Sequence, residues 1–180
     1  MFPPRADTRF SSVIVDSSQM HCFSSEGAGS PNSAFEHSTL DELLAISRDE
    51  LADALEARIS GFEREIALVT LAPELEGADA VIARCRELNI RVALGHSAAN
   101  ADDATRAFDQ GIEMLTHAFN AMPGLHHRAP GPLGEACRRG GIALGLIADG
   151  VHVDPTMAVL LQRLAPEQIV LVSDALAPYG

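Results

Sequence analysis

Residues 66–96 read IALVTLAPELEGADAVIARCRELNIRVALGH. The stretch opens on an apolar run of strand length, Ile66 to Leu71, and closes on a second one, Ile90 to Leu94. Between the two runs, apolar residues recur at the spacing of one helical face: Ala78, Val81, Ile82, Cys85 and Leu88. An apolar strand, an amphipathic helix and a second apolar strand are typical of a βαβ unit in a parallel sheet.

The same alternation continues toward the end of the chain. Three further strands are predicted at 112–116, 142–147 and 168–172, and helices over about 100–110, 133–139 and 155–164. Each strand is followed by a side chain that can bind a metal or transfer a proton. These residues are Glu74, His96, His117, Asp149 with His152, and Asp174. Such residues at the carboxyl end of strand after strand indicate a (β/α)8 barrel, because a doubly wound sheet concentrates its ligands at one switch point.

A complete (β/α)8 barrel typically needs about 250 residues. We therefore expect an α/β protein in which residues 38–180 form a partial TIM-type barrel of about five βα units. Residues 1–37 are rich in Ser, Gly and Pro and are expected to be mostly irregular or partly disordered, although Val13-Ile14-Val15 could form a short strand. Thr39 and Glu42 have the spacing of a capping box, and the apolar residues after them predict a helix extending to Ile59.

The composition of the chain excludes several classes of function and partner. The chain has 47% hydrophobic residues and a net charge of −12, which argues against nucleic acid or an anionic membrane as a partner. No lysine is present, and this excludes Schiff-base and Walker-type lysine chemistry. The three cysteines form no Cys-x-x-Cys pair, and no apolar run approaches the roughly 20 residues of a membrane span. These features predict a cytoplasmic protein.

His96 and His117 are the leading candidates for a metal site. Each follows a predicted strand, and neighbouring strands lie only about 4.8 Å apart, so both imidazoles could converge on one divalent ion such as zinc or iron. The alternative is two buried histidines that are satisfied by backbone hydrogen bonds. Asp174 is either a general base or a helix N-cap, and Arg128 is either an anion-binding fork or a solvated loop residue.

Six phrases of the sequence resemble one known family. In chain order they are Val69-Thr-Leu-Ala-Pro-Glu74, Gly95-His-Ser97, Thr116-His-Ala-Phe-Asn-Ala-Met122, His127-Arg-Ala-Pro-Gly131, Ile147-Ala-Asp-Gly-Val-His152 and Ser173-Asp-Ala175. Together they are similar to N-acetylglucosamine-6-phosphate deacetylases, which are metal-dependent barrel enzymes of the amidohydrolase superfamily. The resemblance covers about residues 60–180.

The resemblance implies a hydrolase of amino-sugar catabolism. A metal-activated water would cleave the acetamide of N-acetylglucosamine 6-phosphate and release glucosamine 6-phosphate and acetate, with zinc or iron as the metal. The resemblance assigns His96 and His117 as metal ligands, Asp174 as the acid–base carboxylate, and Asn120, Ala121, Arg128 and His152 as substrate-binding residues. It also implies a homodimer once the barrel is complete.

One expected element is missing from the sequence. The family's third metal ligand is a glutamate in a Leu-Glu-Gly-Pro motif, and Leu75-Glu-Gly77 lacks the proline and lies downstream of the expected place. Two alternatives therefore stand beside the deacetylase. One is a non-catalytic remnant that binds sugar phosphate or a partner chain, and the other is an amidohydrolase with a different acyl-amino substrate.

Overall fold

The computed structural model describes residues 11–15, 20–24, 48–61 and 66–174. The strands are β1 Ser11–Val15, β2 Met20–Ser24, β3 Ile66–Leu71, β4 Arg91–Leu94, β5 Met114–Leu115, β6 Ala143–Leu146 and β7 Ile169–Leu171. The helices are α2 Arg48–Ile59, α3 Ala78–Glu87, α4 Ala101–Asp109, α5 Gly131–Arg139 and α6 Pro155–Leu164. Within these residues, no helix is both long enough and apolar enough to cross a membrane.

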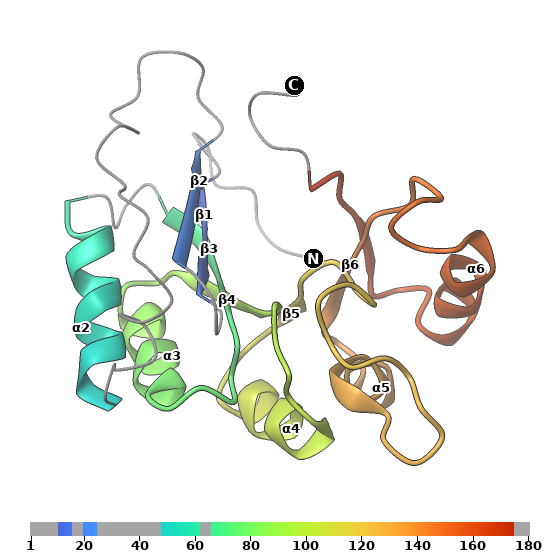
Figure 1. Cartoon of the computed structure of the whole chain (residues 1–180), viewed down its shortest axis with the longest axis horizontal. Coiled ribbons are helices and arrows are strands. Elements are labelled where there is room, and N and C mark those ends of the chain that lie inside the picture. The colour runs from blue at the N-terminus through green and yellow to red at the C-terminus, as the bar shows by residue number, and fades with distance from the viewer. Residues whose placement is uncertain (1–10, 16–19, 25–47, 62–65, 175–180) are drawn as a thin grey trace.

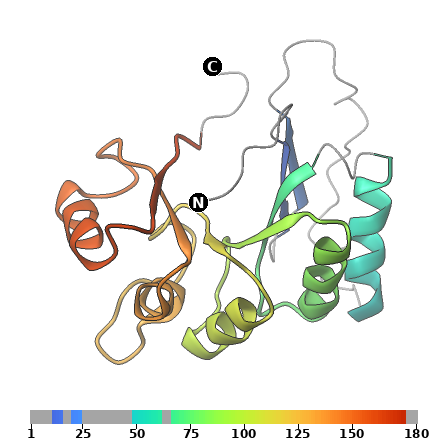
Figure 2. The same cartoon turned by 180° about the vertical axis from the view of Figure 1, so that it is seen from behind.

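All the strands form one sheet in the order β2-β1-β3-β4-β5-β6-β7. Strands β3 to β7 are parallel and lie side by side in sequence order, with no reversal of the kind that defines a doubly wound sheet. The helices form an arc outside the sheet from α2 to α6 (Figures 1 and 2). A sheet that grows in one direction, with its helices outside, is the wall of a (β/α)8 barrel, and the predicted partial barrel is confirmed.

The core lies between the sheet and this arc of helices. Strands β3 to β6 each contribute fully buried aliphatic side chains, among them Val69, Leu94, Leu115 and Leu144. The helices cover them with the apolar faces that the sequence indicated, for example Val81, Ile82 and Cys85 of α3. Parallel strands need cover on both faces, and their near-continuous apolar runs reflect that need.

The elements predicted from residue 66 onward are present, with boundaries that move by no more than two residues. The largest change is at β5, where a run predicted over 112–116 pairs only at Met114 and Leu115. The predicted helix ending at Ile59 is present from Arg48, while Thr39 and Glu42 lie outside the described residues.

The expectation of an irregular segment over residues 1–37 differs from the structure at two places. Residues 11–15 form β1, which pairs in parallel with β3, and residues 20–24 form β2, which pairs antiparallel with β1. Val13 lies opposite Val69, so the apolar run Val13–Val15 is stabilised by a partner more than 50 residues away. The short strand that the sequence allows at Val13–Val15 is present as part of β1, whereas β2 is not predicted by the sequence.

Candidate metal centre

The carboxyl ends of the parallel strands meet at one edge of the sheet. Leu94, the last residue of β4, pairs in register with Leu115, the last residue of β5. His96 and His117 each lie two residues beyond those partners. Because each histidine lies two residues beyond one member of a paired couple, the two histidines lie side by side in the loops that follow β4 and β5.

The two imidazoles meet as the sequence predicted. Nε2 of His117 lies 2.8 Å from Nε2 of His96, and the ring planes are inclined at 69°. His117 is buried, with 3% of its surface exposed, and its Nδ1–H donates to the backbone carbonyl of Asn120 at 3.1 Å. Because a carbonyl only accepts, Nδ1 of His117 carries the hydrogen in this bond. In the neutral imidazole, Nε2 of His117 then has a lone pair that can accept from Nε2–H of His96.

This arrangement fits a divalent metal. Metal-binding histidines commonly donate the second ring nitrogen to a carbonyl or carboxylate, and His117 does so. A cation could replace the shared proton and take both Nε2 atoms as ligands. Within the part of the chain that the structure describes, no group of three or more His, Cys, Asp or Glu side chains could hold a metal. Catalytic zinc sites usually have three protein ligands, and the described residues supply two.

The loops that hold these side chains are backbone-strained. Outside glycine, the described residues with positive φ are Asn89 at 58°, His96 at 50°, His117 at 28°, Phe119 at 78°, Ala121 at 47° and Asp174 at 53°. All except Asn89 lie beyond the carboxyl ends of β4, β5 and β7. Such conformations cost about 1–3 kcal/mol each and gather at functional sites, where surrounding contacts enforce them.

Asn120 and Ala121 lie directly beside the histidine pair. The backbone N–H of Asn120 donates to the carbonyl of His117 at 2.9 Å, and its own carbonyl accepts from the His117 ring. The carbonyl of Ala121 accepts from the N–H of Ser97, the residue after His96. The structure therefore brings these two predicted substrate-binding positions together with both predicted metal ligands.

The other three predicted site residues lie elsewhere along the same edge. Arg128 is exposed in the loop between β5 and α5, and Asp174 is exposed three residues beyond β7. His152 follows β6, and its Nδ1 lies 2.7 Å from Oδ2 of Asp149. The backbone N–H and side chain of His152, together with the N–H of Val151, lower the pKa of Asp149 to about 2. The roles given to Arg128, His152 and Asp174 stay predictions.

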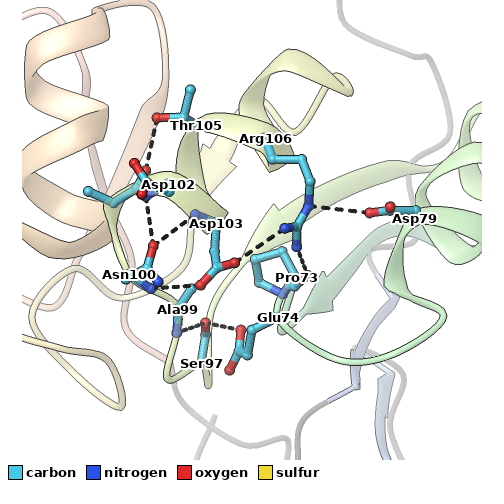
Figure 3. Close-up of polar contacts among 11 residues, drawn as sticks. Pro73, Glu74, Asp79, Ser97, Ala99, Asn100, Asp102, Asp103, Thr105 and Arg106 are labelled. Carbon is cyan, nitrogen blue, oxygen red and sulfur yellow. Dashed lines mark hydrogen bonds and ion pairs between the residues drawn. The ribbon is translucent and has the colours of Figure 1, made fainter.

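The sequence places Glu74 just after a predicted strand but does not indicate its partners. In the structure its carboxylate accepts a hydrogen bond from the Ser97 hydroxyl at 2.6 Å (Figure 3). It also accepts one from the N–H of Ala98 at 2.5 Å. Glu74 therefore joins the loop after β3 to the loop that carries His96. Its place at a strand end was visible in the sequence, but the loop-to-loop contact was not.

Parallel barrel strands with an imidazole pair at their carboxyl edge agree with the amidohydrolase-type hydrolase that the sequence resemblance implies. No family model matches the chain. An N-acetylgalactosamine-6-phosphate deacetylase from Escherichia coli O157:H7 is 41% identical over 141 residues, covering 78% of this chain and 33% of that protein. An N-acetylglucosamine-6-phosphate deacetylase from Bos taurus is 36% identical over 156 residues, covering 75% of this chain and 38% of that protein.

Solved structures agree with the sequence relatives. The N-acetyl-D-glucosamine-6-phosphate deacetylase of Mycobacterium smegmatis matches 72% of this chain and 34% of its own, with a TM-score of 0.67 and 33% identity. The curated relatives and solved structures thus consistently name N-acetylhexosamine-6-phosphate deacetylases over about 75% of this chain. The chain spans about a third of the length of these relatives.

Proposed function

We propose that this chain provides the catalytic part of an amino-sugar-phosphate deacetylase. The reaction would be hydrolysis of the acetamide of N-acetylglucosamine 6-phosphate to glucosamine 6-phosphate and acetate. One observation carries the proposal: His96 and His117 face each other at 2.8 Å on the carboxyl edge of the sheet, in a segment homologous to these deacetylases.

His96 and His117 would hold the metal, zinc or iron by family resemblance. Such an ion polarises the acetamide carbonyl and lowers the pKa of water. Asp174 takes a proton from the attacking water as the new C–O bond forms. It returns that proton to the nitrogen as the C–N bond breaks, so that the amine leaves neutral.

The substrate-binding residues supply hydrogen-bond donors at the same edge. Arg128 offers a planar fork of N–H groups that suits a phosphate. His152 is held at Nδ1 by Asp149, which leaves Nε2 for the substrate. Asn120 and Ala121 offer amide groups beside the metal ligands. The Mycobacterium smegmatis relative has been solved in complex with N-acetyl-D-glucosamine-6-phosphate, and this supports a sugar phosphate as the ligand.

A second substrate is favoured by a specific observation. The Escherichia coli relative, at 41% identity, is an N-acetylgalactosamine-6-phosphate deacetylase. The two sugars differ only in the configuration at C4, and both present the same acetamide and phosphate. The substrate class is therefore an N-acetylhexosamine 6-phosphate, and both epimers belong in the assay.

The experiment is acetate release by a chimera. Residues 66–174 replace the aligned third of the Mycobacterium smegmatis enzyme, which supplies the rest of the barrel. We expect turnover of one or both epimers. Asp174→Asn should lower kcat by about 10²–10⁴ with little change in substrate binding. Arg128→Ala should chiefly raise KM, through loss of a charge-assisted bond worth about 1.5–3 kcal/mol.

The outcomes separate the alternatives. A chimera that unfolds cooperatively but releases no acetate from either sugar would support the non-catalytic remnant. Near-normal turnover in Asp174→Asn would remove this residue from the mechanism. We also propose a cytoplasmic location and a homodimer of the complete barrel. The free thiols of Cys85 and Cys137 are compatible with that location.

A further inference from the structure

Ser97 is the junction of three strand-end loops. Its N–H donates to the carbonyl of Ala121, in the loop after β5, at 2.9 Å. Its hydroxyl donates to Glu74, in the loop after β3, and accepts from the N–H of Ala99 at 3.0 Å (Figure 3). Ser97 itself is 7% exposed and directly follows His96. Whatever fixes Ser97 therefore fixes the residue that directly follows His96 in this loop.

Glu74 uses both carboxylate oxygens to hold this junction. Oε2 accepts from the Ser97 hydroxyl at 2.6 Å, and Oε1 accepts from the N–H of Ala98 at 2.5 Å. Hydrogen bonds to an ionised carboxylate are roughly twice as strong as neutral ones. Two such bonds to consecutive residues restrain the loop in both position and orientation.

The segment that carries Glu74 is itself anchored. Arg106 of α4 donates to the carbonyl of Pro73 at 2.8 Å and forms ion pairs with Asp79 and Asp103. Asn100 caps the first turn of α4, where its side chain accepts from the backbone N–H groups of residues 102 and 103. Figure 3 shows these contacts as one continuous set from Asp79 to Asn100. The backbone segment that carries Glu74 is therefore held in place by α4.

His96 needs such a restraint because its backbone is in the left-handed region, with φ at 50°. The residue before it, Gly95, packs closely against the side chains of Thr70 and Thr116. The ring of His117 is held locally by its bond to the Asn120 carbonyl. The relative position of the two Nε2 atoms thus depends on how firmly the His96 loop is held.

We propose that Glu74 is a positioning residue of the metal centre. Acting through Ser97 and Ala98, it holds the strained His96 loop so that Nε2 of His96 faces Nε2 of His117. This inference rests on the proposed metal-dependent function and adds a residue that does not itself bind the metal.

The experiment compares four versions of the 180-residue chain by Co²⁺ titration, followed by the visible absorption of the bound ion. Glu74→Ala removes both acceptors and should weaken Co²⁺ binding by about tenfold, the lower end for groups that orient metal ligands. Glu74→Gln should recover most of the affinity, because its amide can accept from Ala98 and donate to Ser97. Glu113→Ala removes an exposed carboxylate at the opposite end of the sheet and should leave the affinity unchanged.

A second measurement does not depend on the metal. In the metal-free chain, the imidazole proton shared by His96 and His117 should give a downfield NMR signal. That signal should persist in Glu113→Ala and Glu74→Gln and broaden away in Glu74→Ala. Ser97→Ala serves as a second disrupting variant if Glu74→Ala does not fold, and it should reproduce the loss.

The two measurements separate this inference from the proposed function. If the unaltered chain shows the proton signal and Glu74→Ala loses it, but neither binds Co²⁺, the positioning role holds and the metal-dependent function fails. Unchanged Co²⁺ affinity and an unchanged proton signal in folded Glu74→Ala would overturn the positioning role. Absence of both from the unaltered chain would overturn it as well, because the histidine pair would then not be formed.

Discussion

The Asp149 carboxylate holds the loop after β6 and orients the His152 ring within it. It accepts from the N–H groups of Val151 and His152, each at 2.9 Å, and from the His152 ring at 2.7 Å. These bonds stabilise the ionised form and orient the imidazole. The sequence placed both residues after a strand but did not indicate that one holds the other.

The lowered pKa of Asp149 makes a prediction about pH. The pKa is about 2 in the folded chain and about 3.8 without the bonds. The stabilisation is therefore fully present above pH 3.8 and is lost as the pH falls toward 2. The free energy of unfolding in urea should be measured at pH 5 and pH 3. The unaltered chain should be more stable than Asp149→Asn at pH 5, and this difference should be smaller at pH 3.

The control for this pH measurement is Glu113→Gln, which removes an exposed carboxylate at the other end of the sheet. It reports how far a change in surface charge alone alters the pH response. A stability difference between the chain and Asp149→Asn that stays constant from pH 5 to pH 3 would contradict the account of Asp149.

At the scale of elements, Gly95 sets how closely the ends of three strands approach. A Cβ at this position would lie 2.7 Å from Cβ of Thr116 and 2.9 Å from Cγ2 of Thr70. The hydroxyls of these two threonines lie 3.1 Å apart across the glycine. The close approach brings the loops after β3, β4 and β5 together, and the candidate metal centre is built from those loops.

We expect Gly95→Ala to destabilise the chain by about 1–3 kcal/mol, the usual cost of overpacking. The measurement is the free energy of unfolding in urea. Gly124→Ala is the matched control, because nothing lies within 4 Å of a Cβ there. Equal stability of the two variants would show that the strand ends can separate without cost.

The parallel strands were predictable because their signal is local: an apolar run, then a polar residue at the strand end. His96 and His117 were predictable as a pair for the same reason, since equal offsets from adjacent strands place them together. Strands β1 and β2 depend on pairing with distant partners, and the contact from Glu74 to Ser97 joins two loops. Neither kind of contact leaves a periodic signal in the sequence.

At the scale of the whole molecule, apolar side chains are exposed at the β7 end of the sheet. They are Val159, Leu160 and Leu164 of α6 and Val170 and Leu171 of β7. Among the described strands, β7 pairs only with β6, so its outer edge also presents unpaired backbone groups. Both features favour association with another chain or another part of the barrel.

We therefore expect the 180-residue chain to associate in solution, as measured by sedimentation velocity. Replacing Leu164 and Leu171 by glutamate should shift the distribution toward monomer, because both side chains lie at this end. Leu125→Glu, in the loop before α5, is the control and should leave association unchanged. A monodisperse monomer that unfolds cooperatively would contradict this prediction.

The central claim is that His96 and His117 form the metal centre of this partial barrel. Its most direct test is a Co²⁺ titration of the chain and of His96→Ala, His117→Ala and His126→Ala. We predict weak but saturable binding in the unaltered chain, since the described residues supply two ligands. His126→Ala should bind equally well, while either of the other variants should lose the bound-ion absorption. Equal Co²⁺ uptake by all three variants would contradict the account.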